Sequence, residues 1–260
     1  MRLNVLLSYV VFLIFLPVLS LASDDDLLEV KGREFRAGFN ELPQFGGPSS
    51  VAGELKAADA IKEPAFRFDD IQRGLAPWFA WKEKTFNTLN LALGIEVNFL
   101  YQYATASLGE DRAAGAMYRF PGEWLAYGRG SENTGSLVFR FEYRDKHFTD
   151  IAPAQLGTEI GTASLTPGFA YAEGFGPNVT ELYWKQLFNN KRFGFVAGIL
   201  DFSPYFDYYP FTSLGKGFIS REFLLNPTLA TTGVGALGAA ARGFVTDHIW
   251  LGALSTTLMR

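Results

Sequence analysis

The stretch Leu89–Tyr103, LNLALGIEVNFLYQY, decides the fold, because its apolar side chains recur at every second position. Successive side chains of a β-strand point to opposite faces, so this alternation predicts a strand with one apolar and one mostly polar face. The alternation outlasts the usual globular strand of ~5–6 residues, and a tilted strand that crosses a bilayer needs ~9–11. Tyr101 and Tyr103 end the apolar face, where membrane barrels carry interfacial aromatic residues.

A second strand of the same kind is expected at Gly135–Lys146, GSLVFRFEYRDK. One face carries only apolar and aromatic side chains, and the other carries Arg140, Glu142 and Arg144. Charges in this number are rarely buried without partners, so they suit a water-filled barrel lumen. The solvent-facing surface of a sheet in a soluble protein would fit these charges equally well.

Further segments with strand signals bring the expected total to about nine. A short turn at Asn189–Lys191 and a long connection at 202–232 give the unequal loop lengths that are typical of outer-membrane barrels. We therefore predict an all-β fold, a transmembrane antiparallel β-barrel, with a loop at Asp150–Gly157. The other expected strands are Ala76–Trp81, Ala114–Gly128 with a break at Pro121-Gly122, Thr158–Tyr171, Asn178–Phe188, Arg192–Asp201, Gly233–Phe244 and His248–Thr256.

The N-terminal part of the chain differs from the rest. Residues 1–22 have a positive start at Arg2, an apolar core and small residues at Ser20 and Ala22, which predicts a cleavable signal peptide. A retained membrane anchor is the alternative. Residues 23–75 have poor periodicity, and we expect an N-terminal extension on the periplasmic side or a leader without structure. The barrel domain is then 76–260.

Composition and motifs argue against several classes of function. The formal net charge of −4 argues against nucleic acid as a partner, and the chain has no cysteine for a disulfide framework. His147 lies near Asp145 and Asp150, but a zinc site usually needs more histidines or cysteines, so a solvated loop is favoured. We expect no enzyme activity and no cofactor; a barrel hydrolase built on His147 or His248 is the remaining enzyme alternative.

Six segments follow one another in a fixed order along the chain. They are RGSENTGSLVFRFEYR (Arg129–Arg144), DIAPAQLG (Asp150–Gly157), ELYWKQLFNNKRFGFVAGILD (Glu181–Asp201), YFDYYPF (Tyr205–Phe211), LLNPTLA (Leu224–Ala230) and a final hairpin rich in glycine and alanine. This ordered series, over roughly residues 72–255, resembles the carbohydrate-selective outer-membrane porins (the OprB-like family). The resemblance implies a sixteen-stranded barrel that passes sugars such as glucose by passive, partly selective diffusion. Because only about nine strands are visible and bacterial barrels close with an even number, we expect strands to be missing after residue 260, or one segment not to be a strand.

A sugar offers hydroxyl groups that need polar partners and ring faces that stack on aromatic side chains. The polar strand faces supply both, and residues of the long connection are candidates for a constriction. The lumen candidates are Glu96, Asn98, Gln102, Arg119, Arg140, Glu142, Arg144, Tyr183 and Lys185, and the constriction candidates are Tyr205, Asp207 and Tyr208.

The expected partners are carbohydrate solutes and the lipid of a bacterial outer membrane, and the sequence leaves open whether the protein forms a homo-oligomer. Two alternatives to the sugar porin stand. One is a soluble exported β-protein that binds sugar, and the other is a general or anion-preferring porin. For each lumen candidate, generic lumen polarity without a specific role is the competing interpretation.

Overall fold

The computed structural model describes residues 9–14, 50–59, 69–162, 175–201, 235–246 and 250–257. These residues form one antiparallel sheet in the order β1-β9-β8-β7-β6-β5-β4-β2, and β3 also pairs with β4. The elements are β1 (Tyr9–Ile14), α1 (Val51–Asp59), α2 (Asp69–Leu89), β2 (Leu91–Leu93), β3 (Glu96–Tyr103), β4 (Arg112–Tyr127), β5 (Thr134–Lys146), α3 (Pro153–Glu159), β6 (Phe175–Phe188), β7 (Phe193–Leu200), β8 (Ala236–Phe244) and β9 (Trp250–Thr256).

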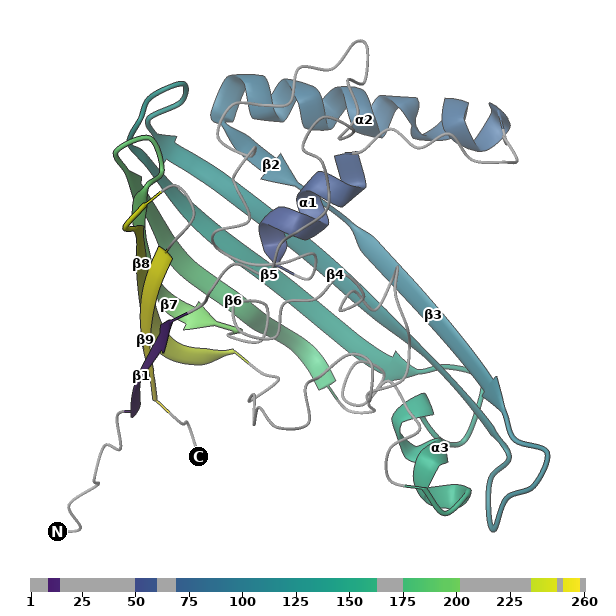
Figure 1. The fold of residues 1–260 in the computed structure, drawn as a ribbon. Helices are drawn as coiled ribbons and strands as arrows, with labels where there is room; N and C mark the ends of the chain where they lie inside the picture. The colour runs from purple at the N-terminus through teal and green to yellow at the C-terminus, as the bar shows by residue number, and fades with distance from the viewer. Residues whose placement is uncertain are drawn as a thin grey trace, which may run out of the picture.

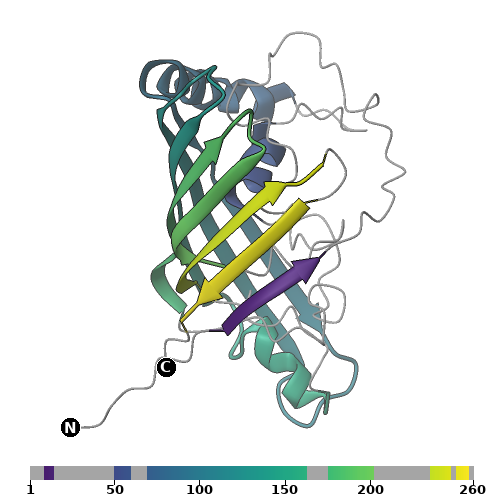
Figure 2. The same cartoon turned by 60° about the vertical axis from the view of Figure 1, so that its left-hand side comes forward.

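The sheet is strongly twisted and curved, and α1 lies against its concave side (Figure 1). α2 lies across one end of the sheet, and α3 lies near the other end. The view in Figure 2 shows β8, β9 and β1 continuing the curve of the sheet. Among the described residues, β1 and the β2/β3 pair are the two edges, so the sheet is open. The predicted all-β antiparallel fold is confirmed at this level.

The strand predicted at Leu89–Tyr103 is confirmed from Leu91 onward, with one interruption, whereas Leu89 is the last residue of α2. It consists of β2 and β3, which both pair with β4 and are separated at Gly94 and Ile95. The Gly94 amide donates to the Pro121 carbonyl oxygen at 2.8 Å, so the interruption lies directly beside Pro121. Proline has no amide hydrogen to give to a ladder, which accounts for the break. A break was predicted at Pro121-Gly122, but β4, which contains these residues, is continuous. The break occurs instead between β2 and β3, which pair with β4 on one side.

The hairpin predicted around Asn189–Lys191 is confirmed. β6 and β7 pair on either side of it, and Asn189, Asn190 and Lys191 all have positive φ angles, of 49°, 53° and 65°. Asparagine tolerates this left-handed region better than most residues, so the sequence of the turn fits its geometry. The hairpin of β8 and β9 is confirmed as well.

Two predicted elements are wrong. Ala76–Trp81 is not a strand but the middle of α2, and Asp150–Gly157 is not only a loop, because α3 begins at Pro153. α2 buries Lys82 and Phe86, which are four residues apart and so lie on one helix face. It ends at Leu89, where Asn90 takes a φ of 55° and its amide donates to the Phe86 carbonyl oxygen at 2.9 Å, a common C-terminal helix cap.

Several predictions lie partly or wholly outside the described residues. α1 falls in the predicted extension 23–75, and α2 crosses its boundary with the predicted barrel at residue 76. Residues 9–14 of the predicted signal peptide form β1, which pairs with β9; the other residues of that segment are not described, and its cleavage stays a prediction. Most of the strand predicted at Thr158–Tyr171 and nearly all of the long connection 202–232 also lie outside the described residues.

Candidate functional site

The two faces of the sheet differ sharply in chemistry. The convex face exposes large apolar side chains on β3, β4, β5, β6, β7, β8 and β9, whereas the concave face buries charged ones. This division follows directly from the alternation in each strand. The exposed convex residues include Val97, Phe99, Tyr101, Tyr103, Phe120, Trp124, Phe141, Leu182, Phe193, Phe195, Leu237 and Leu251.

The buried charges of the concave face converge on two arginines from neighbouring strands. Arg119 of β4 stands opposite Glu142 of β5, and Arg140 stands two residues before Glu142 on the same face. The Arg119 Nε atom lies 3.3 Å from Glu142 Oε2, and Arg144 binds the other oxygen of that carboxylate. The Glu142 side chain is fully buried, so it holds these cations where water cannot compete.

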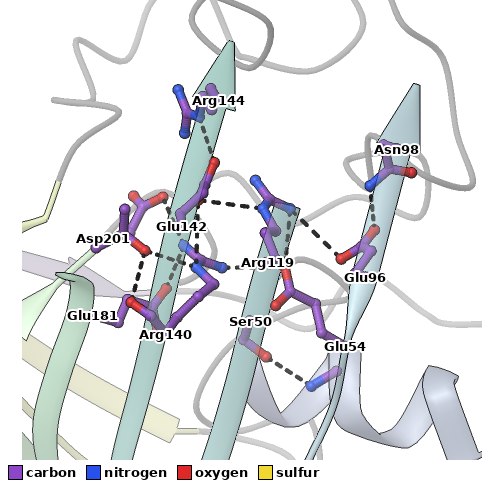
Figure 3. A network of polar contacts seen from close by, with 12 residues as sticks. Ser50, Glu54, Glu96, Asn98, Arg119, Arg140, Glu142, Arg144, Glu181 and Asp201 are labelled. Carbon is purple, nitrogen blue, oxygen red and sulfur yellow. Dashed lines mark hydrogen bonds and ion pairs between the residues drawn. The ribbon is translucent and has the colours of Figure 1, made fainter. Parts of the chain in front are cut away.

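α1 adds a carboxylate to this cluster from outside the sheet (Figure 3). Glu54 Oε1 accepts hydrogen bonds from Arg119 Nη1 at 3.1 Å and from Arg140 Nη1 at 3.2 Å. The other oxygen, Oε2, is buried and accepts no hydrogen bond among the described residues. The Ser50 hydroxyl accepts from the Gly53 amide at 3.1 Å, which caps the first turn of α1 just before Glu54.

β6 completes the environment of Arg140. The Arg140 Nη2 atom lies 2.8 Å from Glu181 Oε1, and its Nε atom donates to the Thr180 hydroxyl at 3.1 Å. Asp201, directly after β7, lies 4.0 Å away. The guanidinium of Arg140 therefore has a separate partner on each side, and its Nη1 group is the one that meets α1.

An apolar cluster adjoins the charged one on the concave side. Val51 and Leu55 of α1 pack there with Phe86 of α2 and with strand residues that include Val138 and Tyr183. Val51 and Leu55 are 0% and 2% exposed, so burial of its apolar face holds α1 against the sheet, and this places Glu54 beside the two arginines.

Burial dominates the protonation of Glu54. It raises the pKa of this carboxyl above its ordinary value of 4.5, although Arg140 and Arg119 act in the opposite direction. The free-energy cost of removing the carboxylate from water is therefore larger than its stabilisation by the two arginines.

The structure brings most of the predicted lumen residues together. Arg119, Arg140, Glu142 and Arg144 form the cluster just described, and Glu96 lies at its edge, 4.0 Å from Arg119. The Asn98 amide donates to Glu96 at 2.9 Å, and Gln102 lies half-buried farther along β3.

The other predicted residues lie elsewhere. Lys185 pairs with Glu123 at 2.6 Å, away from the arginine cluster. Tyr183 is 4% exposed in the apolar cluster, so it offers no free ring face for stacking here. The constriction candidates Tyr205, Asp207 and Tyr208 lie outside the described residues.

The concave-face residues that sequence reasoning missed include Glu54, Glu123, Thr180 and Glu181. Glu123 shares the strand parity of Arg119, and Glu181 shares that of Lys185, so the alternation alone places both on the charged face. Glu54 left no such signal, because it meets Arg140 across 86 residues of sequence.

His147 lies 3.3 Å from the Tyr118 hydroxyl through its Nε2 atom. Within the described ranges, no group of three or more histidine or acidic residues is placed to hold a metal ion. In the same residues, no helix has both the length and the apolar character needed to span a membrane.

Comparison of the chain with protein-family models, with curated proteins and with solved structures finds no match.

Proposed function

We propose that this chain is an outer-membrane β-barrel porin that lets carbohydrates diffuse passively through a polar lumen. One observation carries the proposal: the long strands expose aromatic and aliphatic side chains on the convex face and keep their charges on the concave face. A membrane barrel needs this arrangement, because its outer surface contacts lipid and its inner surface contacts water and solutes.

The extent of the convex apolar face favours a membrane over a soluble role. Ile95, Val97, Phe99, Tyr101 and Tyr103 are each between 48% and 58% exposed along a single edge strand and its approach. Soluble monomers rarely expose contiguous apolar patches larger than a few hundred Å². Water would make such a surface prone to association, whereas lipid tails would cover it.

The chemistry of the concave face suits neutral polyols. The charged side chains of β3, β4 and β5 all lie on this face, so donors and acceptors of the kind that sugar hydroxyl groups require are gathered on one side of the sheet, mostly paired with one another. Selectivity in a pore depends on its width and on the groups that line it. α1 occupies part of this face, so the free width depends on where that helix sits.

Two measurements on the folded protein test the proposal. A folded barrel partitions into the outer-membrane fraction and changes its electrophoretic mobility in detergent on heating. In liposomes, faster swelling with glucose than with amino acids of similar size supports a carbohydrate-selective pore. Equal swelling supports the general porin instead, and no swelling from folded protein overturns the pore and favours the soluble sugar-binding alternative.

A further inference from the structure

We propose that Arg119 and Arg140 form a binding site for the carboxylate of an acidic solute, and that Glu54 of α1 occupies this site in the structure. The inference deepens the proposed function, because it names acidic sugars as a solute class. It rests on that function for the route by which the solute arrives, but the site itself can be tested without transport.

The geometry separates the site from the sheet's own ion pairs. The closest strand carboxylates are held by other nitrogens: Arg119 Nε lies 3.3 Å from Glu142, and Arg140 Nη2 lies 2.8 Å from Glu181. Both Nη1 groups point to a single oxygen of Glu54, at 3.1 and 3.2 Å, and the nearest strand carboxylate to Arg119 Nη1 is Glu96, at 4.0 Å. Two guanidinium groups that converge on one oxygen make a charge-assisted site for one carboxylate.

The strand carboxylates hold this site in place. Glu142 and Glu181 fix both guanidinium groups through contacts that do not involve α1. Arg119 and Arg140 are 9% and 4% exposed, so they already stand in a region of low dielectric where a paired charge interacts strongly. A site that is organised before its ligand arrives loses little conformational entropy on binding.

The occupant of the site belongs to a different element from the site. Glu54 is supplied by α1, whereas both arginines lie on the sheet, 65 and 86 residues away in sequence. Its second oxygen is buried without a hydrogen bond among the described residues, so Glu54 uses only half of its capacity as an acceptor. A solute carboxylate that brings its second oxygen to a donor or to water replaces Glu54 without losing the contacts to the arginines.

The test uses a thiol on α1 as a reporter. The chain has no cysteine, so Leu55→Cys places a single thiol one residue from Glu54, on a side chain that is 2% exposed. Folded protein in detergent is treated with a polar thiol reagent in glucuronate, in glucose and in sodium chloride of equal ionic strength. Glucose and glucuronate differ only in the terminal carbon, which is a carboxylate in the second.

We expect glucuronate alone to accelerate modification of the thiol. A ligand at about ten times its dissociation constant shifts a docking equilibrium about tenfold, and the modification rate of a buried thiol follows that shift. Arg119→Gln is expected to abolish the acceleration, whereas Arg112→Gln, on the exposed end of the same strand, is expected to keep it. Val51→Cys repeats the experiment at a second buried apolar position of α1, in case the variant at position 55 does not fold.

Three results would overturn the inference. Sodium chloride or glucose could accelerate modification of the thiol as much as glucuronate does, or glucuronate could leave the modification rate of the buried thiol unchanged. Failure of the porin proposal is a separate outcome. If folded protein does not swell liposomes but glucuronate accelerates modification of the thiol, the binding site is supported and the pore is rejected. If liposomes swell selectively with glucose and glucuronate has no effect on the thiol, the pore is supported and the binding site is rejected.

Discussion

Glu54 is the residue that ties α1 to the charged face of the sheet, and its protonation should control how firmly the helix is held. The docked pKa is raised by burial, so the docked helix binds a proton more readily than a free helix does. Docking is therefore most favourable below the ordinary pKa of 4.5 and weakens as the pH rises through the docked pKa. The charged groups that act on Glu54 are Arg119, Arg140, Glu96 and Glu142.

We predict that the thiol of the Leu55→Cys variant becomes more accessible as the pH rises above 4.5 and through the raised pKa of Glu54. Glu54→Gln in the same background keeps the shape of the side chain and cannot ionise, so its accessibility should not vary with pH. The rate of modification, corrected for ionisation of the thiol with a cysteine at the exposed Leu108, measures this. Identical pH profiles with and without the Glu54→Gln substitution would contradict the prediction.

For single residues, the sequence predicts the strand face on which a side chain lies better than it predicts the residues that the side chain contacts. The alternation in β5 correctly places Arg140, Glu142 and Arg144 on one face, because strand parity is a local property. It does not reveal that these residues are paired and buried, because Glu54 comes from a segment whose position depends on the whole fold. Tyr183 shows the same limit: its face was predicted, but its packing against the apolar cluster was not.

At the scale of the elements, substitutions on the convex face of β5 can test whether this strand contacts lipid or water. Phe141 is 48% exposed there, and Phe148, shortly after the strand ends, is 95% exposed. In a soluble protein, arginine at either surface position changes the free energy of unfolding by no more than about 0.5 kcal/mol. Within a bilayer, arginine near the midplane costs about 2–4 kcal/mol.

We therefore predict that Phe141→Arg destabilises the protein in lipid vesicles by about 2–4 kcal/mol, while Phe148→Arg has little effect. Denaturant titration of folded protein in vesicles, with unfolding followed by tryptophan fluorescence, gives both values. Equal and small effects of the two substitutions would argue that the convex face does not contact lipid.

The β6–β7 ladder contains a second testable position, Gly198. Its φ angle is 144°, and a Cβ atom there would collide with the Leu182 carbonyl oxygen and lie 2.7 Å from the Tyr183 Cα atom. We predict that Gly198→Ala lowers the free energy of unfolding by more than about 1 kcal/mol. Gly176→Ala in β6 is the matched control, because its Cβ would meet nothing within 4 Å. A Gly198→Ala variant as stable as this control would refute the strained geometry.

One of the wrongly predicted elements, Ala76–Trp81, has an identifiable cause. The aromatic run in Ala76–Trp81 was interpreted as a strand because aromatic residues are enriched in sheets, yet strand propensity depends strongly on context. The helical spacing of Lys82 and Phe86 was the better indicator, since both side chains are buried on one face of α2. The strands with strict alternation, such as β3 and β5, were predicted correctly, because burial on one face fixes their register.

At the scale of the whole molecule, the position of α1 bears on the passage of solutes. α1 lies on the concave side of the sheet, which is the side that a barrel encloses (Figure 1). It covers Arg119 and Arg140, and it adds Val51 and Leu55 to the apolar cluster. A helix held in this place narrows the lumen of the proposed pore, so a variant that cannot dock the helix should conduct better than the natural chain.

We predict that Leu55→Asp increases the single-channel conductance in planar bilayers. An unpaired carboxylate at a position that is 2% exposed costs several kcal/mol, so the helix leaves its site while the strand pairing is retained. Ala52→Asp adds the same charge on the half-buried side of α1 and is expected to conduct like the natural chain. Both variants must keep the heat-dependent mobility of a folded barrel. Equal conductance of the two folded variants would mean that α1 does not obstruct the pore, whereas higher conductance of Leu55→Asp alone would identify the helix as the narrowing element.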